Sequence, residues 1–212
     1  MQIPKTIQNK LDEGRQYRSF EGMEVLAEED GSMTVEGYAS TFDQPYMLFR
    51  DGNYEVWEQV DRDAFAEADM DDIILQYDHA GRVFARKSNG TLAVTPDEVG
   101  LRIHADLGGT ELGRQLYEEI KGGYTTKMSF GFKVAEDRKE VTESDDEVKV
   151  LRTITKIGRV YDVSAVSLPA NDATSISARS YGEGVIAELR QELLEREEQE
   201  RKKEQIKLLL EL

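Results

Sequence analysis

YTTKMSFGFKV, residues 124–134, predicts a β-strand because apolar and polar or small side chains alternate along it. One face of this strand is apolar and carries Met128, Phe130, Phe132 and Val134. The opposite face carries Lys127, Ser129, Gly131 and Lys133. Ser129 is either a small residue that lets another element pack closely or a reactive hydroxyl with a gap beside it. The strand pattern alone favours packing.

The segments around this strand predict an α+β protein that is rich in strands. A helix is expected over residues 110–120, with an apolar stripe at spacing four, a cap at Thr110 and an end at Gly122-Gly123. Asn89-Gly90 predicts a hairpin turn between strands at 83–87 and 91–95. Further strands are expected at 32–42, 54–60, 73–77, 101–107, 150–157 and 160–168.

The 212 residues suit one domain with an appendage. We expect a loosely ordered N-terminal segment over 1–16 and a main domain over 17–181. A long helix rich in Glu, Lys, Arg and Leu is expected over 185–212, separated from the domain by Gly182-Glu183-Gly184. This helix is either a docking element for a partner or a marginally stable charged tail. The pattern does not choose between the two.

Composition excludes several classes of function. The chain has no cysteine, which rules out disulfides, zinc–thiolate sites and a cysteine nucleophile. Its net charge of −16 makes a nucleic-acid partner unexpected. Motifs for metal or phosphate binding are absent from the sequence, so no metal and no cofactor are expected. Without a signal peptide or a long apolar run, a soluble intracellular protein with no membrane partner is expected.

The chain has two histidines, which differ in their surroundings. His104 falls on the polar phase of a strand, beside Arg102 and Asp106, and is expected to be solvated. His79 follows the apolar strand at 73–77, in a place where a scaffold positions reactive groups. The residues alone favour a reactive His79 and a solvated strand end about equally.

A serine nucleophile needs a base for its proton and a third group that orients the base. The strand at 160–168 carries one carboxylate, Asp162, which is costly to bury unless it is paired. Asp162 could form an ion pair with Arg86 or Arg159, or it could orient His79. The G-x-S-x-G pattern is missing around Ser129, which argues against an α/β-hydrolase.

Taken in order, several short segments between residues 34 and 179 resemble the prohead maturation proteases of tailed bacteriophages. The resemblance is carried by VEGYASTF at 35–42, YDH at 77–79, the Gly122-Gly123 turn, KMSFGF at 127–132 and DVSAVSLPAN at 162–171. Each segment alone is weakly specific. Their shared order, with a histidine and a serine in place, makes the match specific.

The resemblance implies a herpesvirus-assemblin-like fold, a mostly antiparallel β-barrel with helices around it. It implies His79 as the general base and Ser129 as the nucleophile. Asp162 stands where the phage family usually has the longer Glu as third member. Backbone N–H groups near Gly131 or the Ala170-Asn171 turn are the candidate donors to the oxyanion.

The implied function is a serine endopeptidase that cleaves the major capsid protein, the scaffold and itself during prohead maturation. It would act in the host cytoplasm inside the assembling prohead, without a cofactor. A homodimer is an expectation from the family, and the C-terminal helix is a candidate docking element. The alternative is a non-catalytic capsid-assembly protein that kept the barrel.

Overall fold

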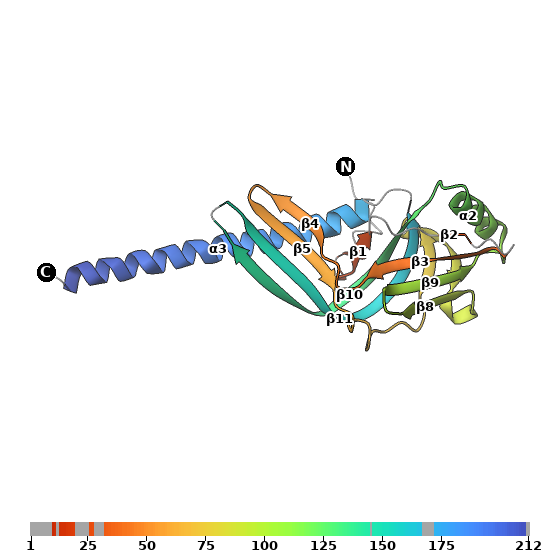
Figure 1. Cartoon of the computed structure of the whole chain (residues 1–212), viewed down its shortest axis with the longest axis horizontal. Coiled ribbons are helices and arrows are strands. Elements are labelled where there is room, and N and C mark those ends of the chain that lie inside the picture. The colour runs from red at the N-terminus through yellow and green to blue at the C-terminus, as the bar shows by residue number, and fades with distance from the viewer. Residues whose placement is uncertain are drawn as a thin grey trace.

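The computed structural model describes residues 10–11, 13–19, 26–27, 32–144, 146–166 and 172–210. In these residues the chain forms two β-sheets and two long helices, so the α+β class is confirmed (Figure 1). Helix α2 (Glu111–Lys121) lies at one end of the molecule, and α3 (Asp172–Leu210) extends far beyond the other end.

The larger sheet is built around a long hairpin. Its strands β10 (Lys127–Glu143) and β11 (Val148–Val166) pair antiparallel. The free side of β11 is shared by two parallel neighbours, β5 (Tyr54–Val60) along its first half and β6 (Ile74–Tyr77) along its second. The remaining strands are β1 (Gln16–Ser19) on β10, β4 (Tyr46–Asp51) on β5, and β7 (Ala80–Arg86) on β6.

The smaller sheet is antiparallel, with the order β2-β3-β9-β8. Its strands are β2 (Leu26–Ala27), β3 (Thr34–Thr41), β8 (Leu92–Pro96) and β9 (Gly100–Asp106). One core joins the sheets, with Val35, Leu101 and Ile103 from the smaller sheet and Met128, Phe130 and Phe132 from β10. The apolar face expected for the strand at 124–134 is therefore buried as predicted.

The described residues do not form the β-barrel that was expected, so this prediction is wrong for them. The pairing is mostly antiparallel, as expected, but the two sheets do not close on each other. The larger sheet has edges at β1, β4 and β7, and the smaller sheet has edges at β2 and β8. Closure would require one continuous ladder around the molecule.

The expected hairpin at Asn89-Gly90 is also wrong. Strand β7 pairs with β6 in the larger sheet, whereas β8 pairs with β9 in the smaller one. The short 3-10 helix η1 (Lys87–Asn89) joins them and ends at Gly90, whose φ of 78° suits glycine. The turn signal was correct, but the turn connects two sheets rather than two paired strands.

The two helices differ in how well the sequence predicted them. Helix α2 forms as expected, and the Thr110 hydroxyl accepts a hydrogen bond from Gly113 N–H at 2.9 Å. Helix α3 begins at Asp172, well before residue 185, and continues through the glycines that were expected to separate it. Gly182 lies against Phe49, which a Cβ would approach to 2.5 Å. Close packing explains this glycine.

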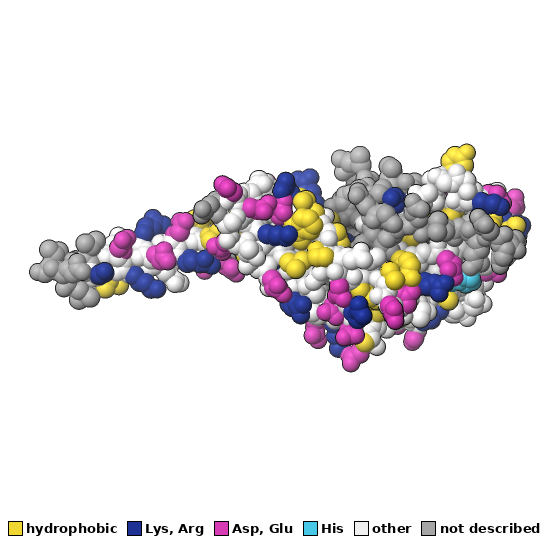
Figure 2. Space-filling model, in the orientation of Figure 1, with side chains coloured by type: hydrophobic (Ala, Val, Ile, Leu, Met, Phe, Trp, Pro, Cys, Tyr) yellow, Lys and Arg dark blue, Asp and Glu magenta, His cyan; other side chains and the backbone are white. Residues whose placement is uncertain are grey.

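Part of α3 packs against the larger sheet in a second apolar cluster, separate from the main core. Val185 and Ile186 are buried against Val56 of β5 and Val150 of β11. From residue 194 to 207 every side chain is exposed, and acidic and basic side chains are interspersed along the surface (Figure 2). Among the described helices, none combines the length and apolar character needed to cross a membrane.

Candidate active site

The structure brings His79, Ser129 and Asp162 together. His79 lies in the turn between β6 and β7, Ser129 on β10 and Asp162 on the neighbouring β11. His79 Nε2 is 2.6 Å from Ser129 Oγ, and His79 Nδ1 is hydrogen-bonded to Asp162 Oδ1. The three side chains therefore form the continuous chain of contacts that a serine, a base and an orienting carboxylate need.

The turn that carries His79 has an unusual backbone. Asp78 and His79 have φ values of 47° and 57°, in the left-handed region that few residues other than glycine adopt. Contacts with β11 hold this conformation, since Asp78 N–H donates to the Ala165 carbonyl and His79 N–H donates to Ser164 Oγ, both at 3.1 Å. Strain of this kind persists where the surroundings fix it, and it concentrates at functional sites.

Asp162 is buried, with 1% of its surface exposed, and remains ionised. Burial alone would raise the pKa of its carboxyl group, but electrostatic attraction and a hydrogen bond from His79, together with the positive charges of Lys10 and Arg15, outweigh burial and lower the pKa. Arg86 and Arg159, the alternative partners, form ion pairs with Asp72 and Asp69 instead. His79, together with Arg15 Nη1 at 3.8 Å from Asp162 Oδ2, therefore offsets the cost of burying Asp162.

Ser164 contacts both members of the His–Asp pair, and the sequence analysis did not single it out. Its Oγ is 3.2 Å from His79 Nδ1 and 3.3 Å from Asp162 Oδ1. Together with the bond from His79 N–H, these contacts position the histidine. The spacing of Ser164 from Asp162 could have identified it, because residues two apart on a strand share a face.

Gly131 makes space for the carboxylate of Asp162. A Cβ at this position would lie 2.5 Å from Asp162 Oδ2 and 2.9 Å from Tyr17 Cε1. The gap beside the serine that the sequence suggested is therefore filled by the Asp162 side chain and the Tyr17 ring. A role for Gly131 at the oxyanion stays a prediction, and Ala170 and Asn171 lie outside the described residues.

Replacing Gly131 with Ala is expected to lower kcat for peptide cleavage by about 100-fold, because the methyl group would displace the carboxylate that orients His79. Gly158→Ala is the matched control, since its Cβ would meet no atom closer than 3.5 Å. Cleavage rates and thermal unfolding of both variants check this. A Gly131→Ala chain with wild-type kcat would show that the close contact is unimportant.

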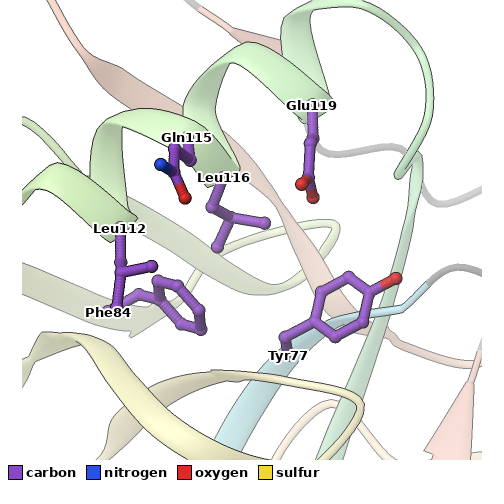
Figure 3. Close-up of a pocket in the computed structure, with 6 residues that line it drawn as sticks. All are labelled: Tyr77, Phe84, Leu112, Gln115, Leu116 and Glu119. Carbon is purple, nitrogen blue, oxygen red and sulfur yellow. The ribbon is translucent and has the colours of Figure 1, made fainter.

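Two other features lie outside this cluster. His104 is solvated as expected, with its side chain 45% exposed and its Nδ1 3.1 Å from Glu36. A mostly apolar cavity of about 300 Å³ lies between α2 and the β6–β7 hairpin, beside the turn that carries His79 (Figure 3). Its lining residues are Tyr77, Phe84, Leu112, Gln115, Leu116 and Glu119.

A family model described as the caudovirus prohead serine protease matches residues 21–185, which is most of the chain. The chain belongs to this family. It is therefore a serine peptidase of the kind that tailed phages use in capsid maturation. The matched range contains all three residues of the cluster. No curated protein and no solved structure matches the chain.

Proposed function

We propose that this prohead protease is an endopeptidase that cleaves the major capsid protein and the scaffold of an assembling phage shell. The supporting observation is the contact chain from Asp162 through His79 to Ser129 inside the family-matched range. A capsid-assembly protein without activity would have no use for a buried carboxylate, imidazole and hydroxyl in this order.

In the proposed mechanism, Asp162 accepts a hydrogen bond from His79 Nδ1–H and so fixes the tautomer that leaves Nε2 free to accept a proton. His79 takes the Ser129 proton while Oγ bonds to the substrate carbonyl carbon. The protonated His79 then gives this proton to the leaving amine as the C–N bond breaks. Water hydrolyses the resulting ester by the same route. Backbone N–H groups near Gly131 or the Ala170-Asn171 turn are the proposed oxyanion donors.

The proposed place of action is the interior of the prohead. Subunits packed inside a closed shell meet the peptidase at a high effective concentration, so modest affinity for each subunit is sufficient. Cleavage before closure would be slow because the same partners are dilute.

Co-expression with the capsid subunit of the same phage tests the proposed function. The wild-type chain is expected to shorten the capsid subunit, and Ser129→Ala is expected to leave it intact. Equal cleavage with both chains would defeat the assignment of Ser129. An intact capsid subunit with both would favour the non-catalytic assembly protein.

We further propose that the exposed part of α3 docks the peptidase on scaffold or on a second copy of itself. Stopping the chain after Leu193 preserves the buried contacts of Val185 and Ile186 and removes the exposed residues 194–207 with the five residues that follow them. The shortened chain is expected to cleave peptides at the wild-type rate. Its incorporation into shells should fall at least about tenfold, the effect of 1.4 kcal/mol of lost binding. Unchanged incorporation would contradict the docking role.

A further inference from the structure

The three residues of the site are covered by the N-terminal part of their own chain. His79, Ser129 and Asp162 have exposed fractions of 1%, 0% and 1%. Three covering contacts come from residues 10–17. Lys10 Nζ donates to the His79 carbonyl at 3.1 Å, Arg15 Nη1 lies 3.8 Å from Asp162 Oδ2, and the Tyr17 ring centroid is 4.4 Å from that of His79. A substrate cannot reach Ser129 while this segment is in place.

Strand β1 lies at Ser129 in the manner of a bound peptide. It is an edge strand of the larger sheet and pairs antiparallel with β10, with Ser19 opposite Ser129. Adding an extended strand to a sheet edge is a common way to bind a peptide. The Ser129 hydroxyl donates a hydrogen bond to the Arg18 carbonyl oxygen at 2.7 Å, and it would have to turn from this oxygen to the carbonyl carbon to attack. The peptide bond next to the nucleophile is therefore the one between Arg18 and Ser19.

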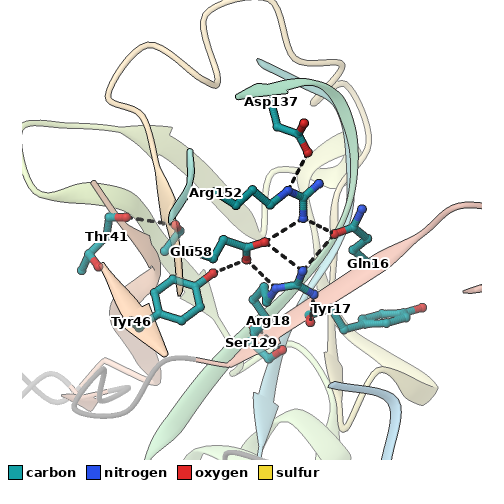
Figure 4. A network of polar contacts seen from close by, with 10 residues as sticks. Gln16, Tyr17, Arg18, Thr41, Tyr46, Glu58, Ser129, Asp137 and Arg152 are labelled. Carbon is teal, nitrogen blue, oxygen red and sulfur yellow. Dashed lines mark hydrogen bonds and ion pairs between the residues drawn. The ribbon is translucent and has the colours of Figure 1, made fainter. Parts of the chain in front are cut away.

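The side chain of Arg18 fills a buried polar pocket (Figure 4). Its Nε lies 2.5 Å from Glu58 Oε1 and its Nη2 lies 3.0 Å from Glu58 Oε2, so the guanidinium donates to both oxygens of one carboxylate. Nη2 also donates to Gln16 Oε1 at 2.9 Å. Two parallel bonds of this kind recognise the planar guanidinium better than an ammonium.

The charged residues around Arg18 carry a net negative charge that balances the positive charge of one arginine. Glu58 also accepts from Arg152 Nη1 at 2.7 Å, and Arg152 Nε donates to Asp137 at 2.6 Å. Two carboxylates and one guanidinium therefore remain when Arg18 leaves, which is a net charge of −1. Burial alone would raise the pKa of Glu58, but Arg18 and Arg152 outweigh burial and lower the pKa to about 2. The pocket is thus complementary to a cation.

We propose that β1 is a substrate of the site that it covers, that the chain cleaves its own bond between Arg18 and Ser19, and that Glu58 selects arginine on the acyl side of the cleaved bond. This inference rests on the proposed peptidase function and adds its substrate preference. Ser129 Oγ bonds to the Arg18 carbonyl carbon and its proton moves to His79. The proton then passes to the Ser19 nitrogen as the C–N bond breaks, and water releases Arg18 as a carboxylate.

Until this cut, Lys10, Arg15 and Tyr17 keep the site closed. The family-matched range begins at residue 21, so the cut separates the covering segment and leaves that range intact. Departure of β1 would expose the β10 edge at Ser129 and the Glu58 pocket together. A capsid or scaffold segment with arginine before its cleaved bond would then occupy the same positions.

The first test identifies the N-terminus of the full chain after expression. A new N-terminus at Ser19 is expected for the wild type and not for Ser129→Ala. Arg18→Gln should slow the cut at least about 100-fold, because it removes the guanidinium that pairs with both oxygens of the Glu58 carboxylate. Arg62→Gln is the matched control at an exposed arginine and should be cut like the wild type.

The second test does not depend on the folding of Arg18 variants. The peptide EGRQYRSFEGM, residues 13–23, is offered to the wild-type chain beside the same peptide with Gln in place of Arg18. The arginine peptide should have a kcat/KM at least about 100-fold higher. Glu58→Gln should shrink this ratio, whereas a merely structural Glu58 would lower both values equally.

The outcomes separate the inference from the function on which it rests. A chain that cleaves the capsid subunit through Ser129 but keeps the Arg18–Ser19 bond overturns the inference and leaves the proposed function standing. The same holds if the two peptides are cleaved equally well. If Ser129 is needed for cleavage of none of the three substrates, which are the capsid subunit, the chain itself and the peptide, both the inference and the proposed function are overturned.

Discussion

A chain with His79 replaced by Ala is expected to cleave the capsid subunit roughly 10⁴- to 10⁶-fold more slowly than the wild type. The reason is that Ser129 Oγ has His79 Nε2 at 2.6 Å as the base for its proton. Without the imidazole, the hydroxyl would have to lose its proton to water. Residual cleavage would come from substrate binding and oxyanion stabilisation alone.

The other histidine provides the control for this experiment. His104→Ala removes an exposed imidazole that contacts Glu36 on the smaller sheet, whereas β10 belongs to the larger sheet. Its cleavage rate should equal that of the wild type, and thermal unfolding should confirm that both variants are folded. A folded His79→Ala chain that retains more than a tenth of the wild-type rate would exclude His79 as the base.

Asp162→Asn is expected to lower kcat by about 10⁴-fold while the chain stays folded. An amide has no charge to stabilise the imidazolium. Its NH₂ group can also donate to His79 Nδ1, which would place the imidazole proton on Nε2 and remove the acceptor for Ser129. KM should change little, because the carboxylate acts through His79.

Asp69→Asn is the matched control, since Asp69 forms an exposed pair with Arg159, the alternative partner once considered for Asp162. Exposed pairs contribute little, so this variant should behave like the wild type. Steady-state kinetics with one peptide substrate compare the two. Equal kcat values for Asp162→Asn and Asp69→Asn would show that Asp162 is a structural charge only.

Local patterns predicted the parts of the structure that depend on near neighbours. The helix stripe, the Thr110 cap and the apolar face of β10 all follow from spacing within one element. The resemblance to prohead proteases then selected His79, Ser129 and Asp162, which lie up to 83 residues apart in the sequence. Spacing alone could not bring them together, because strand pairing decides which neighbours β10 and β11 have.

The rest of the structure depends on distant pairings that the sequence pattern does not reveal. Ser129 was expected on a polar strand face, yet it is completely buried beside His79, whereas Lys133 on the same phase of β10 is exposed. Arg18 is buried where its guanidinium pairs with Glu58 of β5, and Glu58 pairs in turn with Arg152 of β11. Whether the sheets close into a barrel depends likewise on how β11 divides its edge between β5 and β6.

The most direct measurement on the central claim is to label the nucleophile covalently. A fluorophosphonate reacts with an activated serine as Oγ bonds to phosphorus and fluoride leaves, and peptide mass mapping then locates the adduct. The account predicts one adduct, on Ser129, in wild-type chain that cleaves the capsid subunit, and none in the His79→Ala chain. An active chain that carries its adduct on another residue, or equal labelling of Ser129 without His79, would contradict it.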